Sequence, residues 1–132
     1  MASVDTAVIV FAHGSRIEAA NVAVRDAARQ LAQTGGYPRV EAAFLELGQP
    51  DLPGAVRSLA AQGCRRFVVV PYFLTPGLHL DRDLPRLIRY ISKENSELEI
   101  LVTDPLGGHP GLVAALQDRC AEVLHKAALK KT

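Results

Sequence analysis

Three side chains that bind metals or exchange protons recur in this chain at a constant interval. His13, Glu46 and His79 each lie 33 residues after the one before. Two neutral imidazoles and one carboxylate suit a borderline divalent metal such as cobalt, iron or nickel. No fourth protein ligand is evident, so such a set would leave coordination positions open, as suits a metal that is handed on. The same groups can also accept protons near neutral pH.

The interval equals the length of one strand and one helix. Four short apolar runs predict strands at residues 6–12, 40–47, 67–74 and 98–103. The first and third runs consist almost entirely of β-branched and other apolar residues. That composition is typical of parallel strands that are buried on both faces.

Between and after these runs, apolar residues recur at helical spacing. They predict helices at residues 17–33, 51–62, 81–93 and 110–128. Strands that alternate with helices of this length form parallel sheets through right-handed crossovers. We therefore expect one α/β domain over residues 1–132, with a four-stranded parallel sheet flanked by helices. The expected topology is flavodoxin-like, with strand order 2-1-3-4.

This topology would bring the three side chains to one edge of the sheet. Ligands of open α/β sheets bind beyond the carboxyl ends of the strands, where the strand order reverses. His13 ends the first run, Glu46 lies near the end of the second, and His79 lies in the predicted loop after the third. Taken singly, each could be an ordinary hydrogen-bonded or solvated residue. Their convergence favours a functional site, because a carboxylate among apolar strand residues is costly unless it is paired or coordinated.

Composition excludes several classes of partner and location. The formal net charge is +1 among 132 residues, which argues against a general nucleic-acid or membrane-surface binder. Cys64 and Cys120 are far apart and form no metal-binding motif, as expected in a reducing compartment. We find no signal peptide and no apolar run near the ~20 residues of a membrane span. A cytoplasmic protein is expected.

Other catalytic motifs fit poorly. A histidine phosphatase places arginine before the His-Gly pair, where this chain has Ala12. The nucleophile elbow, the phosphate-binding loop and the dinucleotide fingerprint are all missing. Ser15 is instead predicted to cap a helix near Ile17, with Glu18 completing a capping box. A metal carrier or another non-enzymatic α/β binding module remains an alternative.

Three segments together resemble a known family. They are "VIVFAHGSR", "AFLELGQPDLPG" continuing to "PYFLTPGLHLDRDLP", and "DPLGGHPGLV". In this order they resemble the short form of the sirohydrochlorin cobaltochelatase (CbiX) family, over essentially the whole chain. The resemblance implies a chelatase-like fold and a lyase that inserts a divalent metal into a tetrapyrrole. It further implies that His13 and His79 bind the metal and that Glu46 assists metal delivery or proton removal.

The resemblance also implies the partners. The tetrapyrrole would be sirohydrochlorin, and the metal substrate would be Co²⁺, with Fe²⁺ or Ni²⁺ as alternatives. No organic cofactor is expected. Arg16, Arg82 and Arg86 are placed to meet carboxylates of the macrocycle, and Leu78 to meet its apolar face. A short chain offers only an open rim, so a homodimer with its rims facing inward is expected to close the site.

Overall fold

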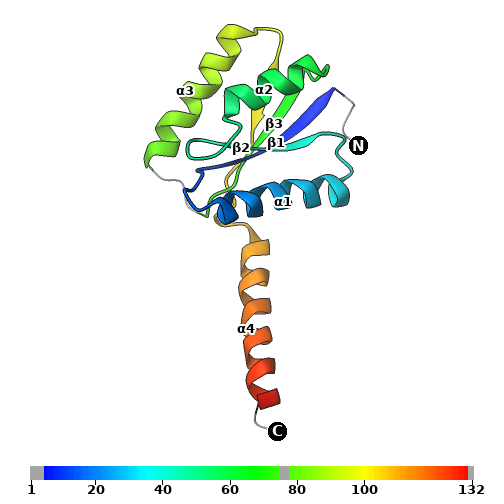
Figure 1. Cartoon of the computed structure of the whole chain (residues 1–132), viewed down its shortest axis with the longest axis vertical. Helices are drawn as coiled ribbons and strands as arrows, with labels where there is room; N and C mark the ends of the chain where they lie inside the picture. Colours follow the sequence, from blue (N-terminus) through cyan, green and yellow to red (C-terminus); the bar gives the residue numbers. More distant parts are fainter. Residues whose placement is uncertain (1–4, 75–77, 131–132) are drawn as a thin grey trace.

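Four parallel strands form one sheet in the order β2-β1-β3-β4, as the sequence predicted. The computed structural model describes residues 5–74 and 78–130, without the side chains of residues 78–80. The strands are β1 (Thr6–Ala12), β2 (Val40–Phe44), β3 (Arg66–Pro71) and β4 (Glu99–Val102) (Figure 1). β1 pairs with both β2 and β3, and each of its residues is buried. An apolar run without polar interruption suits this central position, because helices cover both of its faces.

Three helices cover the sheet. α1 (Glu18–Gly35) packs on one face, over β1 and β2. α2 (Leu52–Ala61) and α3 (Leu78–Glu94) lie on the other face. The two faces of β1 contribute alternate residues to two separate cores: Ile9 packs on the side of α2 and α3, and Val10 on the side of α1.

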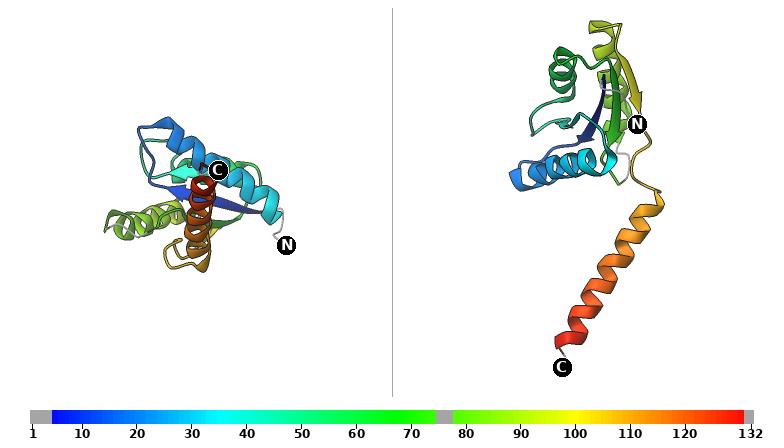
Figure 2. Two further views of the ribbon diagram at one scale, coloured as in Figure 1. Left: turned by 90° about the horizontal axis from the view of Figure 1, so that it is seen from below. Right: turned by 90° about the vertical axis from the view of Figure 1, so that its right-hand side faces the viewer.

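The fourth helix departs from this pattern. α4 (Pro110–Lys130) leaves the carboxyl edge of the sheet and extends away from the rest of the molecule (Figures 1 and 2). Every residue from Val113 to Lys130 is exposed.

Two boundaries differ from the sequence-based expectation in ways that matter for the site. β2 ends at Phe44, so Glu46 lies in the following loop and not in a strand. This loop returns to the strand end, where the Phe44 amide bonds to the Pro50 carbonyl. α3 begins at Leu78, so His79 lies in its first turn and the prediction of a loop was wrong. No helix-breaking residue separates Leu78 from Asp81, which lets the helix start early.

The predicted capping box was also wrong. α1 begins at Glu18 with Ile17 as its cap residue, and no side chain caps it. The Ser15 hydroxyl accepts a hydrogen bond from the Ile17 amide at 3.0 Å, two residues along, in a local turn. The Glu18 carboxylate instead pairs with Arg25, at 2.8 Å.

The two cysteines lie in different surroundings. Cys64 is buried in the core, and Cys120 is exposed on α4. Within residues 5–74 and 78–130, none of the helices combines the length and apolar character of a membrane span. The cytoplasmic location stays a prediction.

The core between α2 and the sheet should carry much of the stability. Leu59 is 1% exposed, so Leu59→Ala should lower the free energy of unfolding by about 2–5 kcal/mol through lost burial and a residual cavity. Urea unfolding followed by circular dichroism measures this. Leu129→Ala, at a position 60% exposed, serves as the control and should change it by less than about 0.5 kcal/mol. Equal effects of the two substitutions would contradict this assignment of the core.

Candidate functional site

His13 and Glu46 meet at the carboxyl edge of the sheet. The Nε2 atom of His13 lies 3.7 Å from Oε1 of Glu46, and the side chains are 52% and 59% exposed. This separation is too long for a hydrogen bond. Two ligands about 2.1 Å from a shared tetrahedral metal would lie roughly 3.4 Å apart, so the observed spacing is close to that of a metal-bridged pair.

Backbone pairing holds these two residues side by side. The β1–β2 ladder continues past the strand ends, because the Leu45 amide bonds to the Ala12 carbonyl at 2.9 Å. The Glu46 amide likewise bonds to the His13 carbonyl at 3.0 Å. The register of the parallel strands therefore sets the spacing of these two candidate side chains.

Gly14 permits this close approach. Its φ angle is +96°, and a Cβ atom at this position would lie 1.6 Å from the Glu46 carbonyl oxygen. A side chain cannot be accommodated there, because the obstructing atom belongs to the backbone. The glycine after His13 is therefore required for the loop of Glu46 to lie against the end of β1.

Asn21 joins the two loops, and the sequence analysis did not identify it. Its side chain is buried, accepts from the Ser15 amide at 2.9 Å, and donates to the carbonyls of Ser15 at 2.9 Å and Leu47 at 3.0 Å. The sequence does contain a sign of this role. Asn21 is a polar residue at helical spacing from Val24 and Ala28, and all three lie on the buried face of α1. Buried polar groups need partners, and here the partners are the two loops that carry His13 and Glu46.

The loop after β2 has a second attachment to α1. Arg25 donates to the Gln49 carbonyl at 3.1 Å, pairs with Glu18, and lies 5.3 Å from the centre of the Phe44 ring. Leu47 in the same loop has a positive φ angle of 58°, a conformation that is uncommon outside glycine. The loop of Glu46 is thus held in a defined shape and is not simply a solvated connection.

The three predicted arginines are all exposed. Arg16 is exposed three residues after His13. Arg82 and Arg86 are exposed on α3, and helical spacing puts them on the side opposite the buried Leu84.

The side chains of His79 and Leu78 lie outside the described residues. Their roles, and those of the three arginines, stay predictions. Within the side chains that the structure describes, no group of three metal-binding residues forms. His13 and Glu46 are the pair that the fold brings together.

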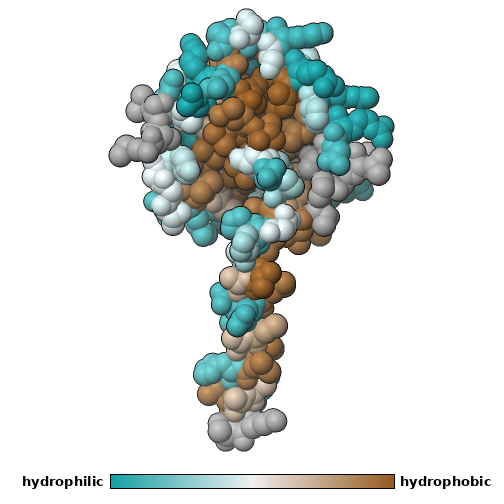
Figure 3. All heavy atoms as spheres, turned by 180° about the vertical axis from the view of Figure 1, so that it is seen from behind, coloured by the Kyte–Doolittle hydropathy of each residue, from teal (hydrophilic) through white to brown (hydrophobic). Residues whose placement is uncertain are grey.

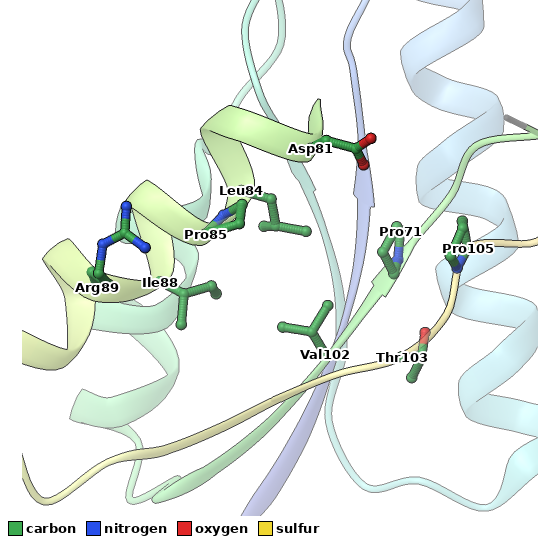
Figure 4. A pocket seen from close by; sticks show the side chains of 9 residues that line it. All are labelled: Pro71, Asp81, Leu84, Pro85, Ile88, Arg89, Val102, Thr103 and Pro105. Carbon is green, nitrogen blue, oxygen red and sulfur yellow. The ribbon is translucent and has the colours of Figure 1, made fainter. Parts of the chain in front are cut away.

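An apolar groove of about 530 Å³ lies beside this edge, between α3 and the ends of β3 and β4. Leu84 and Ile88 of α3 point toward Pro71 and Val102 across it (Figure 4). Its full described lining is Pro71, Asp81, Leu84, Pro85, Ile88, Arg89, Val102, Thr103 and Pro105. His13 and Glu46 are not among these residues, so the groove and the polar pair are separate features.

Two further residues near the edge have structural roles. Phe73 packs edge-on against Phe11, with ring centres 6.3 Å apart, and is a partly buried residue at the margin of the core. His109 caps α4, because its Nδ1 accepts from the Gly111 amide at 2.9 Å.

Comparison with known proteins finds one family and several relatives that this chain resembles. The CbiX family model matches residues 7–123. The chain is 37% identical to the chloroplastic sirohydrochlorin ferrochelatase of Arabidopsis thaliana, covering 89% of this chain and 52% of the plant protein. It is 30% identical to the sirohydrochlorin cobaltochelatase of Methanopyrus kandleri, covering 89% of this chain and 96% of that protein.

Solved structures show the same fold. A CbiX protein from Marinobacter aquaeolei VT8 superposes with a TM-score of 0.80 at 30% identity, covering 92% of this chain and 98% of the other. The sirohydrochlorin chelatase SirB from Bacillus subtilis subspecies spizizenii superposes with a TM-score of 0.82 at 24% identity. This chain spans 51% of SirB, about half its length.

The contact at Gly14 yields a matched test. Gly14→Ala should separate the two loops and weaken Co²⁺ binding at least about tenfold, because the new Cβ meets the Glu46 backbone. Gly63→Ala is the control. The φ angle of Gly63 is +103°, but open space surrounds this residue, so the variant has similar backbone strain without the clash. Isothermal titration with Co²⁺ measures the affinities. If Gly14→Ala binds as tightly as Gly63→Ala, the close approach does not shape the metal site.

Proposed function

The chain belongs to the CbiX family, and from this premise we propose that it is a sirohydrochlorin chelatase that inserts a divalent metal into the macrocycle. The observation that carries the proposal is the convergence of His13 and Glu46, 3.7 Å apart, on an open edge of the sheet. An imidazole and a carboxylate in that arrangement can hold a metal weakly and can also accept protons.

The reaction exchanges one metal ion for two protons. The metal must lose water ligands, and two pyrrole N–H groups of the macrocycle must be deprotonated as their nitrogens bind the metal. We assign His13 and His79 to holding the incoming ion, and Glu46 to metal delivery or acceptance of a pyrrole proton. An exposed, incompletely ligated site favours this transfer, because the remaining coordination positions are open to the nitrogens of the substrate.

Cobalt is the metal that we propose, and iron is the second candidate. The family and the Methanopyrus kandleri relative are associated with cobalt insertion, whereas the Arabidopsis thaliana relative is a ferrochelatase. A donor set of imidazole and carboxylate accepts Co²⁺, Fe²⁺ and Ni²⁺ alike, so metal supply and site geometry decide between them.

Arginines at the edge would bind the substrate's carboxylates. Arg16 is exposed and makes no hydrogen bond or ion pair with another described residue. Arg82 and Arg86 would contribute from α3, and Leu78 would contact the apolar face of the ring. Guanidinium groups suit this role because they bind carboxylates through two parallel hydrogen bonds.

We also propose that the active form is a homodimer with the two edges facing each other. The side chains of His13 and Glu46 are more than half exposed, so one chain alone does not shield the reaction from water. Two edges related by a two-fold axis would enclose the macrocycle between them.

The central test is metal insertion. Purified protein is mixed with sirohydrochlorin and Co²⁺, Fe²⁺ or Ni²⁺ under anaerobic conditions, and the change in absorption is followed. His13→Ala, His79→Ala and Glu46→Gln should each lower kcat/KM by about 10²-fold or more, as expected when a metal ligand or a positioned base is lost. His125→Ala replaces an exposed histidine of α4 and should keep full activity. No insertion of any metal by the wild-type protein would favour a metal-carrier role instead.

Substrate binding is tested separately from chemistry. Arg16→Ala should raise KM for sirohydrochlorin about three- to tenfold with little change in kcat, because it removes a contact made equally in the ground and transition states. Arg119→Ala is the control, since Arg119 is exposed on α4 and pairs with Glu122 at 3.0 Å. An unchanged KM in the Arg16 variant would remove this residue from the substrate site.

A further inference from the structure

A second cavity differs in chemical character from the apolar groove. Hydrophobic residues gather on the body of the molecule above the start of α4 and along that helix (Figure 3). By contrast, a cavity of about 390 Å³ lies between α1 and the outer strand β2, and its lining includes Arg25, Arg29 and Arg39. Neither His13 nor Glu46 lines this cavity, so the proposed metal chemistry does not account for it.

One side of α1 supplies two guanidinium groups and the space between them. Arg25, Ala28, Arg29 and Ala32 all line the cavity. They follow one another at three- and four-residue intervals, so they lie on the same side of the helix. The small alanine side chains leave room beside the arginines. The volume falls within the range of cavities that bind small molecules.

The arginines keep hydrogen-bond donors available for a ligand. A guanidinium group has five N–H donors. Arg29 uses one nitrogen to pair with Asp26, at 2.7 Å. Across the described part of the chain, the side chain of Arg39 has no hydrogen bond or ion pair with another residue. The cavity therefore offers positively charged donors that its own chain does not use.

The outer edge of β2 adds main-chain donors. The Val8 amide bonds to the Arg39 carbonyl at 2.9 Å, so every second residue from Arg39 onward faces β1. The residues between them face the outer edge, and the Phe44 amide accordingly bonds to the loop after β2 and not to β1. The amides of Val40 and Ala42 therefore face outward, and both residues line the cavity.

The donors approach from both faces of the sheet. Val40 and Ala42 pack on the side of α1, whereas Ala43 packs on the side of α2 and α3, so alternation places Arg39 on this second side. A ligand at the edge would meet guanidinium groups from two directions, with amides between them. A phosphate group suits this arrangement, because it presents three or more acceptor oxygens in different directions. A planar carboxylate presents only two.

Arg25 connects the cavity with the loop that carries Glu46. It donates to the carbonyl of Gln49, three residues after Glu46, at 3.1 Å. Its side chain pairs with Glu18 but is still 37% exposed. A guanidinium group bonds more strongly to a charged oxygen than to a neutral carbonyl. An anion in the cavity would therefore compete with the loop for Arg25.

We propose that this cavity binds the phosphate group of a small molecule, and that the bound phosphate draws Arg25 away from the Gln49 carbonyl. Occupancy of the cavity then loosens one attachment of the loop that carries Glu46. Tests of this binding need neither a metal nor sirohydrochlorin. Failure of this proposal would therefore leave the proposed chelatase function unaffected.

Titration of isotope-labelled protein with inorganic phosphate, followed by NMR, tests the binding. The amide resonances of Val40 and Ala42 should shift and saturate, with a dissociation constant in the millimolar range or below. A parallel titration with phenyl phosphate distinguishes the sources: tighter binding indicates a phosphate ester, and equal or weaker binding indicates the free ion. Acetate should bind at least about fivefold more weakly. No saturation with either phosphate compound, or equally tight binding of acetate, would overturn the proposal.

Three substitutions test the charges. Arg29→Gln and Arg39→Gln should each weaken phosphate binding at least about tenfold, because each removes a charged donor. Glu41→Gln should strengthen it about two- to fivefold, because Glu41 also lines the cavity and repels an anion. Arg119→Gln is the control on α4 and should bind phosphate like the wild type. Unchanged affinity in both the Arg29 and Arg39 variants would show that phosphate binds elsewhere.

A steric pair of variants leaves every charge in place. Ala32→Met fills part of the cavity and should weaken phosphate binding at least about fivefold. Ala23→Met is the matched control, because Ala23 is exposed and lies nine residues away, on the opposite side of α1. Methionine is a good helix former, so both variants should fold. Equal affinities in the two variants would contradict binding in the cavity.

The carbonyl carbon of Gln49 reports on the link to the loop. Loss of its hydrogen bond from Arg25 should move this resonance upfield as phosphate is added. The change should follow the same concentration dependence as the Val40 amide, and Arg39→Gln should shift both curves to higher phosphate. A Gln49 resonance that stays in place while the Val40 amide saturates would overturn the link.

Discussion

The close approach of the Gly14 and Glu46 backbones is the contact on which the candidate site depends. It extends the β1–β2 pairing beyond the strands and leaves the side chains of His13 and Glu46 on the same edge, 3.7 Å apart. Asn21 reinforces it from α1 by bonding to both loops. The spacing of the His13–Glu46 pair is therefore a property of main-chain hydrogen bonds, which are less adaptable than side-chain contacts.

This construction fits the metal transfer that we propose. The two side chains are more than half exposed, yet the loops that carry them are anchored to a buried helix face. Rigid support with open coordination positions allows an ion to be held in a defined place without being enclosed. A site of this kind can serve metal transfer better than permanent metal storage.

The same edge of the sheet bears on the assembly that we propose. α4 begins there and extends away from the sheet, and each of its residues from Val113 to Lys130 is exposed. Two such edges related by a two-fold axis would enclose a large macrocycle between them.

Much of the fold and part of the site followed from the sequence alone. Uninterrupted apolar runs, helical spacing and turn residues predicted the parallel sheet, its order and the edge shared by His13 and Glu46, because these depend on local pattern and on the handedness of crossovers. Tertiary structure decided the rest. The end of β2 at Phe44, the role of Asn21 and the direction of α4 depend on contacts between segments far apart in the chain. No local pattern specifies such contacts, because a buried polar group or an apolar stripe shows only that a partner is needed and not which segment supplies it.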